Sequence, residues 1–195
     1  MLAAVILSGG ASRRMGSPKA LLAYQGRPFL QHLLEVTRDS RIGVRRIVLG
    51  AHAQPIAKAL DLSADEIVIN SDWDKGQLSS IQAALNSLPA ETDGMLLCLI
   101  DHPLISASLV HELISRFYES RAAVVLPTFQ GRRGHPVIFS SQVYDELQNA
   151  PLEVGARAVV WAHKNEVCEV PTTEEGCVLN LNDPETFERI TGSKE

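Results

Sequence analysis

Glycines and basic side chains gather in one short stretch near the amino terminus, SGGASRRMGSPK. Gly9 and Gly10 come first, and Arg14 and Lys19 follow. A glycine backbone can approach a ligand closely, and its N–H groups can bind phosphate oxygens. Arginine can bind two such oxygens at once, whereas lysine acts as a point charge. The combination predicts a phosphate site, although a glycine-rich turn with basic helix caps would give a similar pattern.

Two common phosphate-binding motifs do not describe this stretch. The Walker motif needs a lysine directly after its last glycine, but Gly16 is followed by Ser17 and Pro18 before Lys19. The dinucleotide pattern GxGxxG is also absent. The whole chain has a net charge of -5, which argues against a nucleic acid as the partner. The expected ligand is therefore a small anion.

The elements that must position this stretch follow from the apolar pattern. Aliphatic runs predict strands at 2–7, 46–51, 66–70, 95–100 and 122–127, and amphipathic spacing predicts helices at 29–38, 55–60, 77–88 and 106–118. Strands that are apolar on both faces and alternate with helices predict a doubly wound α/β fold, Rossmann-like, with a mostly parallel sheet covered on both faces. Length and composition favour one domain over residues 1–195.

The pattern loosens after Pro127. Short strands are expected at 135–139, 166–171 and 177–181, with helices at 142–148 and 155–163. These predict a small antiparallel addition in the carboxyl-terminal half.

Cysteine spacing and hydropathy bear on location. Cys98, Cys168 and Cys177 include no CxxC pair, which favours free thiols in a reducing compartment. Apolar runs stay shorter than the roughly 18 residues that a membrane span needs. A cytoplasmic protein without a membrane partner is expected.

Two further segments supply polar groups at predicted element ends. Asp101 follows the strand at 95–100, where a carboxylate could hold Mg²⁺ or could simply cap a turn. Gly76, Gln77, Ser79 and Ser80 open the helix at 77–88, and helix starts offer free N–H groups. Since ligands of such sheets bind beyond the carboxyl ends of the strands, we expect these groups to face Gly9 and Gly10.

The stretch LSGGASRRMGSPK resembles the signature L-A-(A/G)-G-x-S-x-R-M-G-x-x-K of the molybdopterin nucleotidyltransferases, the MobA/MocA-like group. The similarity continues through residues 154–160 to NLNDPETF near the carboxyl end. It implies transfer of a nucleoside monophosphate from CTP or GTP to the terminal phosphate of the molybdenum-pterin cofactor, with release of pyrophosphate.

The resemblance also implies residue roles. Arg14 and Lys19 would bind the triphosphate, and the family's D-x-P motif makes Asp101 the Mg²⁺ ligand, with Asn180 and Asn182 as further candidates. The family's R-G-H-P segment places Arg133 and His135 near the pterin acceptor, although the basic loop could equally be solvated and His135 could be a structural histidine bonded to a backbone carbonyl. The implied nucleotide contacts are Leu7, Ser8, Gly9, Gly10, Ser12, Gly76, Gln77, Ser79 and Ser80.

The identity of the nucleotide is balanced between two branches of the family. Residues 76–81, 133–139 and 155–157 resemble the cytidylyl branch and favour CTP, whereas Gly9, Asn180 and Asn182 resemble the guanylyl branch and favour GTP. We expect CTP. An isoprenoid or sugar phosphate acceptor remains an alternative, as does a chaperone that binds nucleotide or cofactor without turnover. A molybdoenzyme that receives the product is a further possible partner.

Overall fold

The computed structural model describes residues 1–192 and is built around one large mixed sheet. Its strands are β1 (Leu2–Ser8), β4 (Ile42–Leu49), β5 (Ile67–Ile69), β6 (Gly94–Leu99), β7 (Val124–Phe129), β8 (Arg132–Arg133), β9 (Val137–Ser140) and β10 (Val167–Pro171). Along the sheet the order is β10-β7-β9-β6-β1-β4-β5, and β8 pairs with β7. The pairs β1–β4, β1–β6, β4–β5 and β7–β10 are parallel, whereas β9 runs antiparallel to both β6 and β7.

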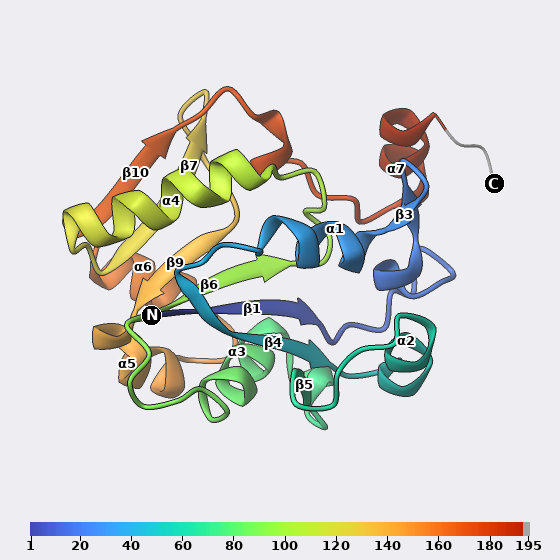
Figure 1. Cartoon of the computed structure of the whole chain (residues 1–195), viewed down its shortest axis with the longest axis horizontal. Helices are drawn as coiled ribbons and strands as arrows, with labels where there is room; N and C mark the ends of the chain where they lie inside the picture. The colour runs from blue at the N-terminus through green and yellow to red at the C-terminus, as the bar shows by residue number, and fades with distance from the viewer. Residues whose placement is uncertain (193–195) are drawn as a thin grey trace.

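Helices cover both faces of the sheet. They are α1 (Phe29–Val36), α2 (Ala53–Ala59), α3 (Gln77–Leu85), α4 (Ala107–Ser120), α5 (Tyr144–Asn149), α6 (Arg157–Ala162) and α7 (Pro184–Thr191). Figure 1 shows α1 and α4 in front of the sheet, with α3 and α5 along its lower side. The doubly wound α/β fold and its antiparallel strand β9 are thus as predicted.

The alternation of β1 explains how one strand serves two cores. Leu2 and Ile6 pack into the layer under α1, α2 and α4, while Val5 and Leu7 pack into the layer under α3, α5 and α6. Successive side chains of a strand point to opposite faces, so a strand covered on both sides must be apolar throughout. All seven residues of β1 are buried.

Two local predictions need correction. Residues 177–181 do not form a strand: a short 3-10 turn (Glu175–Cys177) leads into a loop. Cys177 and Leu181 are apolar because each is buried in a core cluster, not because they belong to the sheet. Strand β4 begins at Ile42, four residues before the predicted start, because its first residues are only partly covered.

A hairpin that the apolar pattern did not predict follows the glycine-rich stretch with Arg14 and Lys19. It consists of β2 (Ala23–Tyr24) and β3 (Arg27–Pro28), joined by Gln25 and Gly26, which both have positive φ. Two positive φ values are what the tight turn of a two-residue hairpin requires.

The sheet also fixes where a ligand can bind. Strand β1 has parallel neighbours on both sides, β4 on one and β6 on the other, so the connections leave it in opposite directions. This is the switch point of a doubly wound sheet, and a crevice forms there beyond the carboxyl ends of the strands. The arrows of β1, β4 and β6 point to the same edge in Figure 1.

We predict that Gly50→Ala destabilises the protein by about 1–3 kcal/mol through overpacking. A Cβ at Gly50 would come within 2.4 Å of the Gly9 carbonyl oxygen and 2.6 Å of the Trp73 Cβ. Gly10→Ala is the matched control, since its Cβ would meet nothing within 4 Å. Urea unfolding of both variants tests this, and equal midpoints would contradict the predicted close packing.

Candidate functional site

A cavity of about 250 Å³ lies at the switch point of the sheet. Its lining is Leu7, Gly9, Gly10, Lys19, Trp73, Gly76, Gln77, Ser80, Leu99, Ile100 and Asp101. The structure therefore brings the glycine turn after β1, the start of α3 and the aspartate after β6 into one place. Ser8, Ser12, Ser79, Arg14, Asn180 and Asn182 lie outside this lining.

The segment from Ser12 to Lys19 is braced at both ends. The Ser12 hydroxyl accepts a hydrogen bond from the Lys19 backbone N–H at 3.1 Å, and the Ser12 carbonyl accepts one from Met15 at 2.9 Å. Met15 is buried in a small cluster with Phe29 and with Phe187 of α7. Ser12 thus shapes the loop, and Ser8 is a buried residue at the end of β1.

Lys19 is the main cation of this cavity. Its Nζ donates a hydrogen bond to the Asn182 side-chain oxygen and lies 3.8 Å from Oδ2 of Asp101. The pKa of Lys19 is lowered, mainly by burial. The carboxylate of Asp101 opposes this shift, and the positive charge of Arg14 adds to it. Arg14 itself is exposed. An anionic ligand between Lys19 and Arg14 would compensate for the hydration that the Lys19 ammonium loses by burial.

The residues around Asp101 fit a divalent ion that arrives with a nucleotide. Asp101 is the one carboxylate there, and the Asn182 amide oxygen lies next to the same lysine. The Leu181 N–H donates a hydrogen bond of 2.7 Å to the Asp101 carbonyl, which holds the two segments together. Nucleotide-bound Mg²⁺ typically uses one or two protein carboxylates plus phosphate oxygens. Asn180 is exposed, and residues 1–192 contain no cluster of three acidic, histidine or cysteine side chains suited to a metal.

The start of α3 is held by a buried asparagine. The Asn70 Nδ2 donates hydrogen bonds to the hydroxyls of Ser79 at 2.9 Å and Ser80 at 3.0 Å. The Ser79 hydroxyl also donates to the backbone carbonyls of Asp72 and Gly76. Ser79 is therefore a structural brace, and Ser80 is the serine that lines the cavity.

A second, larger cavity of about 560 Å³ contains the predicted acceptor residues. Arg133 and His135 line it, and Gln77 lines both cavities, so both spaces border the start of α3. The Arg133 guanidinium forms an ion pair of 2.7 Å with Glu169 of β10. Burial lowers the pKa of His135 to about 4, with a further decrease from His102, so its imidazole is neutral at pH 7.

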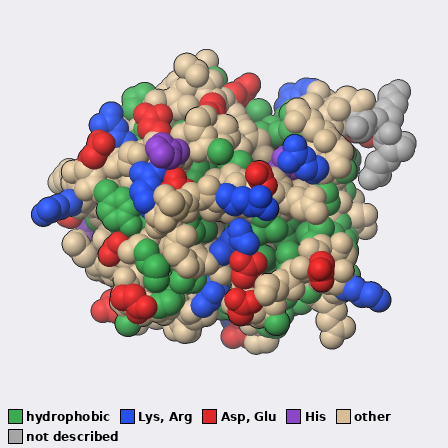
Figure 2. Space-filling model, in the orientation of Figure 1, with side chains coloured by type: hydrophobic (Ala, Val, Ile, Leu, Met, Phe, Trp, Pro, Cys, Tyr) green, Lys and Arg blue, Asp and Glu red, His purple; other side chains and the backbone are tan. Residues whose placement is uncertain are grey.

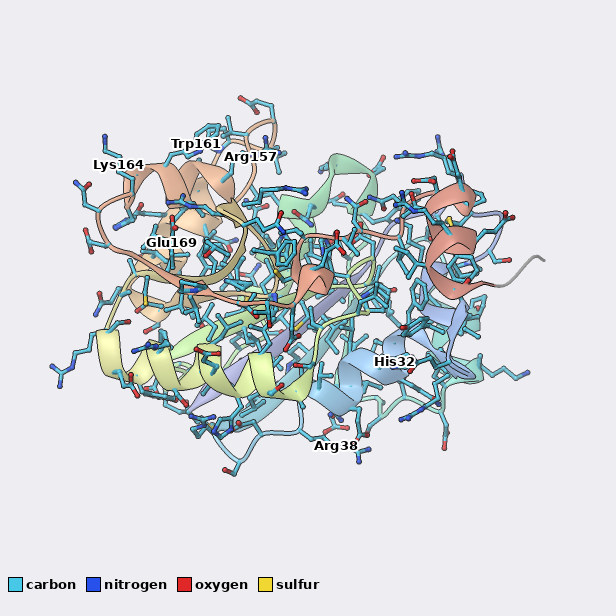
Figure 3. The ribbon with its side chains drawn as sticks, turned by 90° about the horizontal axis from the view of Figure 1, so that it is seen from above. His32, Arg38, Arg157, Trp161, Lys164 and Glu169 are labelled. Carbon is cyan, nitrogen blue, oxygen red and sulfur yellow. The ribbon has the colours of Figure 1, made fainter. Side chains whose placement is uncertain are left out.

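Several cavity residues were missed or set aside by the sequence analysis. Trp73 lines the smaller cavity, whereas Glu153, Arg157 and Trp161 line the larger one. Figure 3 shows Arg157 and Trp161 beside each other on α6. His102, which follows the metal-ligand candidate, is buried with its ring centroid 4.9 Å from that of His135. The only available signal was the resemblance of residues 154–160 to the family, which named no role.

A glycine loop with a basic residue, facing one carboxylate across the switch point, is typical of doubly wound α/β proteins that bind nucleotides. The comparison with known families is specific. The model of the MobA-like NTP transferase domain matches residues 4–167, and the chain belongs to this family.

Relatives of this chain carry more than one name. It is 32% identical over 143 residues to the nicotine blue oxidoreductase of Paenarthrobacter nicotinovorans, covering 70% of each chain. It is 30% identical over 188 residues to a probable molybdenum cofactor guanylyltransferase of Flavobacterium johnsoniae, covering 95% of this chain and 88% of the relative. The crystal structure of Rv0371c from Mycobacterium tuberculosis superposes with a TM-score of 0.83 at 26% identity, covering 98% and 97%. Because one fold serves several reactions, the reaction must be argued from the site.

Charged side chains of both signs share one face of the molecule. On the face shown in Figure 2, Lys and Arg side chains are interspersed with Asp and Glu. Among residues 1–192, no helix combines the length and apolar character needed to cross a bilayer.

We predict that Asn70→Ala lowers the free energy of unfolding by about 1–3 kcal/mol, because two buried hydroxyls lose their partner. It should also weaken nucleotide binding, since Ser80 lines the cavity. Asn86→Ala, an exposed asparagine just after α3, is the control. Urea unfolding and calorimetric titration with CTP and GTP measure the two effects. A variant that matches the unmodified protein in both would contradict the role given to Asn70.

Proposed function

We propose that this protein transfers a nucleoside monophosphate from a nucleoside triphosphate to the terminal phosphate of molybdopterin or the molybdenum cofactor, releasing pyrophosphate. The observation that carries the proposal is that Gln77 belongs to the linings of both cavities, which places the two spaces next to the same residue. The smaller cavity offers Lys19 and Asp101 to a triphosphate, and the larger one offers room for an acceptor. The relatives that are molybdenum cofactor guanylyltransferases support the same reaction class.

The proposed chemistry needs charge neutralisation more than a general base. A phosphate monoester is already anionic at neutral pH, so it can attack the α-phosphate without losing a proton to the protein. Lys19 and Arg14 would offset charge on the triphosphate as pyrophosphate leaves, and the glycine backbone would orient it. Asp101 and Asn182 would hold Mg²⁺, which supplies further neutralisation of phosphate oxygens when bound. Arg133 and the neutral imidazole of His135 would contact the acceptor.

CTP is the donor that we propose, because the segments at 76–81 and 133–139 resemble the cytidylyl branch of the family. The relatives that are guanylyltransferases make GTP the second candidate. Two alternatives would use the same donor cavity. One is transfer to an isoprenoid or sugar phosphate, and the other is binding of nucleotide or cofactor without turnover. Pyrophosphate release in the presence of Mg²⁺, CTP or GTP, and molybdopterin separates the proposed reaction from both alternatives.

We predict that Lys19→Ala and Asp101→Ala each reduce turnover by about 10²-fold or more, as loss of one preorganised charge typically does. Both side chains sit at the cavity and are partly exposed, so the fold should survive. Lys75→Ala is the control, because Lys75 is exposed, lies outside the cavity lining and pairs with Asp72. Turnover is read as pyrophosphate release at saturating Mg²⁺. Near-normal turnover in either cavity variant would refute its assigned role.

The donor preference should respond to the volume at Gly9. A Cβ at Gly9 would come within 3.1 Å of the Ser80 hydroxyl, so Gly9→Ala narrows the cavity. We expect this variant to increase the preference for CTP over GTP by up to about 1–3 kcal/mol in relative kcat/KM. Equal concentrations of both nucleotides compete in one reaction, and product mass gives the ratio. Mainly guanylyl transfer by the unmodified protein would refute CTP as the donor.

A further inference from the structure

The rim of the larger cavity exposes apolar surface that needs an explanation. Trp161 of α6 is 60% exposed and Leu152 is 44% exposed, and both line this cavity. An indole facing water leaves apolar area uncovered, and large exposed apolar groups at a cavity mark binding surfaces. Trp161 also presents a flat ring, which favours partners that can stack on it.

Two arginines lie at the same rim, and only one of them already has an ion-pair partner. Arg133 is already compensated by Glu169, with 2.7 Å between the guanidinium and the carboxylate. Arg157 is exposed, and the described residues offer it no ion pair. Arg157 and Trp161 are four positions apart in one helix, so their side chains lie on the same face. Figure 3 shows these two side chains adjacent. A positive charge therefore stands free beside the exposed indole.

A carboxylate completes the set. Glu153 lines the same cavity from the loop before α6 and is exposed. Ionised carboxylates only accept hydrogen bonds, so Glu153 would favour a ligand edge that presents N–H donors. A flat ring, a free cation and an acceptor-only group together fit a planar, nitrogen-rich heterocycle with an anionic substituent. An aliphatic phosphate would satisfy the cation alone. A sugar phosphate could also donate its hydroxyls to Glu153, but neither has an aromatic ring to stack on the indole.

We propose that Trp161 is the stacking platform for the acceptor's ring system, with Arg157 binding its anionic substituent and Glu153 its N–H edge. This inference rests on the proposed function and deepens it, because it makes Trp161 the residue that selects a heterocyclic acceptor over an isoprenoid or sugar phosphate.

The chain contains two tryptophans, and each lines a different cavity: Trp73 the smaller and Trp161 the larger. In the Trp73→Phe variant, Trp161 is the remaining indole and reports on the larger cavity alone. Pterin-6-carboxylate is the probe, since it is a planar anionic heterocycle. Ribose 5-phosphate is the matched anion without an aromatic ring. We expect the pterin to quench Trp161 fluorescence and the ribose phosphate to leave it unchanged.

The substitutions are made in the otherwise unmodified chain, and affinity is measured by calorimetry. Trp161→Ala should raise the Kd for pterin-6-carboxylate by about 2- to 10-fold, and Trp161→Phe, which keeps a ring, should largely restore it. Arg157→Ala should weaken pterin binding more than Arg133→Ala, because Arg133 is already paired. Lys164→Ala removes an exposed positive charge from the segment just after α6 and is the control. Because Trp161 is mostly exposed, an unchanged urea midpoint confirms that its variants fold.

Several outcomes would overturn the inference. They are equal pterin affinity in Trp161→Ala and the unmodified protein, equal quenching by ribose 5-phosphate, and a dimer in sedimentation that Trp161→Ala abolishes. The two proposals also fail separately. If molybdopterin supports pyrophosphate release and Trp161→Ala leaves its KM unchanged, the stacking platform is wrong and the proposed function stands. If pterin binding depends on Trp161 but neither CTP nor GTP gives pyrophosphate, the heterocycle site stands and the transferase reaction is wrong.

Discussion

The half-buried ammonium of Lys19 is the constraint on which the site depends. Removing a charge from water is costly unless partners compensate, and here the compensation comes from Asp101 after β6 and Asn182 before α7. Asn182 lies 163 positions along the chain from Lys19. One charge therefore ties together three segments that are far apart in sequence. Burial also leaves the cation short of solvation, so the site favours an anion. In the proposed function, the triphosphate is that anion.

The sheet explains why these segments meet. Strand β1 is buried on both faces and must end where its neighbours end, at Ser8, with β6 ending at Leu99 beside it. The glycine turn after the first strand packs against the loop after β4. The Ala51 N–H donates a hydrogen bond to the Gly9 carbonyl, and a Cβ at Gly50 would come within 2.4 Å of that carbonyl oxygen. The glycine at position 50 thus lets the turn after β1 lie where it does.

Features that depend on residues close together in the chain could be predicted from the sequence. The buried strands, the helix α4 and the aspartate that follows β6 all reflect periodicity and residue type, and the Ser106 hydroxyl caps α4 by accepting a hydrogen bond from the Leu109 N–H. The sequence predicts a strand at 177–181 because separately buried residues such as Leu181 give the same apolar pattern as a strand. The short hairpin at 23–28 has too few residues to show the alternation of apolar and polar side chains that predicts a strand. The pairing of Lys19 with Asn182, and the exposure of Trp161, depend on tertiary contacts that no local pattern contains.

The division of labour between the two cavities also bears on how this fold supports different reactions. The residues of the smaller cavity are tied to the core: Leu7 is buried next to the end of β1, Leu99 ends β6, and Ser80 is held by the buried Asn70. Changing them disturbs packing. The rim of the larger cavity is different, because Glu153, Arg157 and Trp161 are exposed and carry few internal contacts. Substitutions at such positions usually change stability by less than about 0.5 kcal/mol. Under the proposed function, the acceptor could therefore be exchanged by altering α6 and the loop before it while the smaller cavity stays intact, which is consistent with relatives of this chain bearing the names of different enzymes.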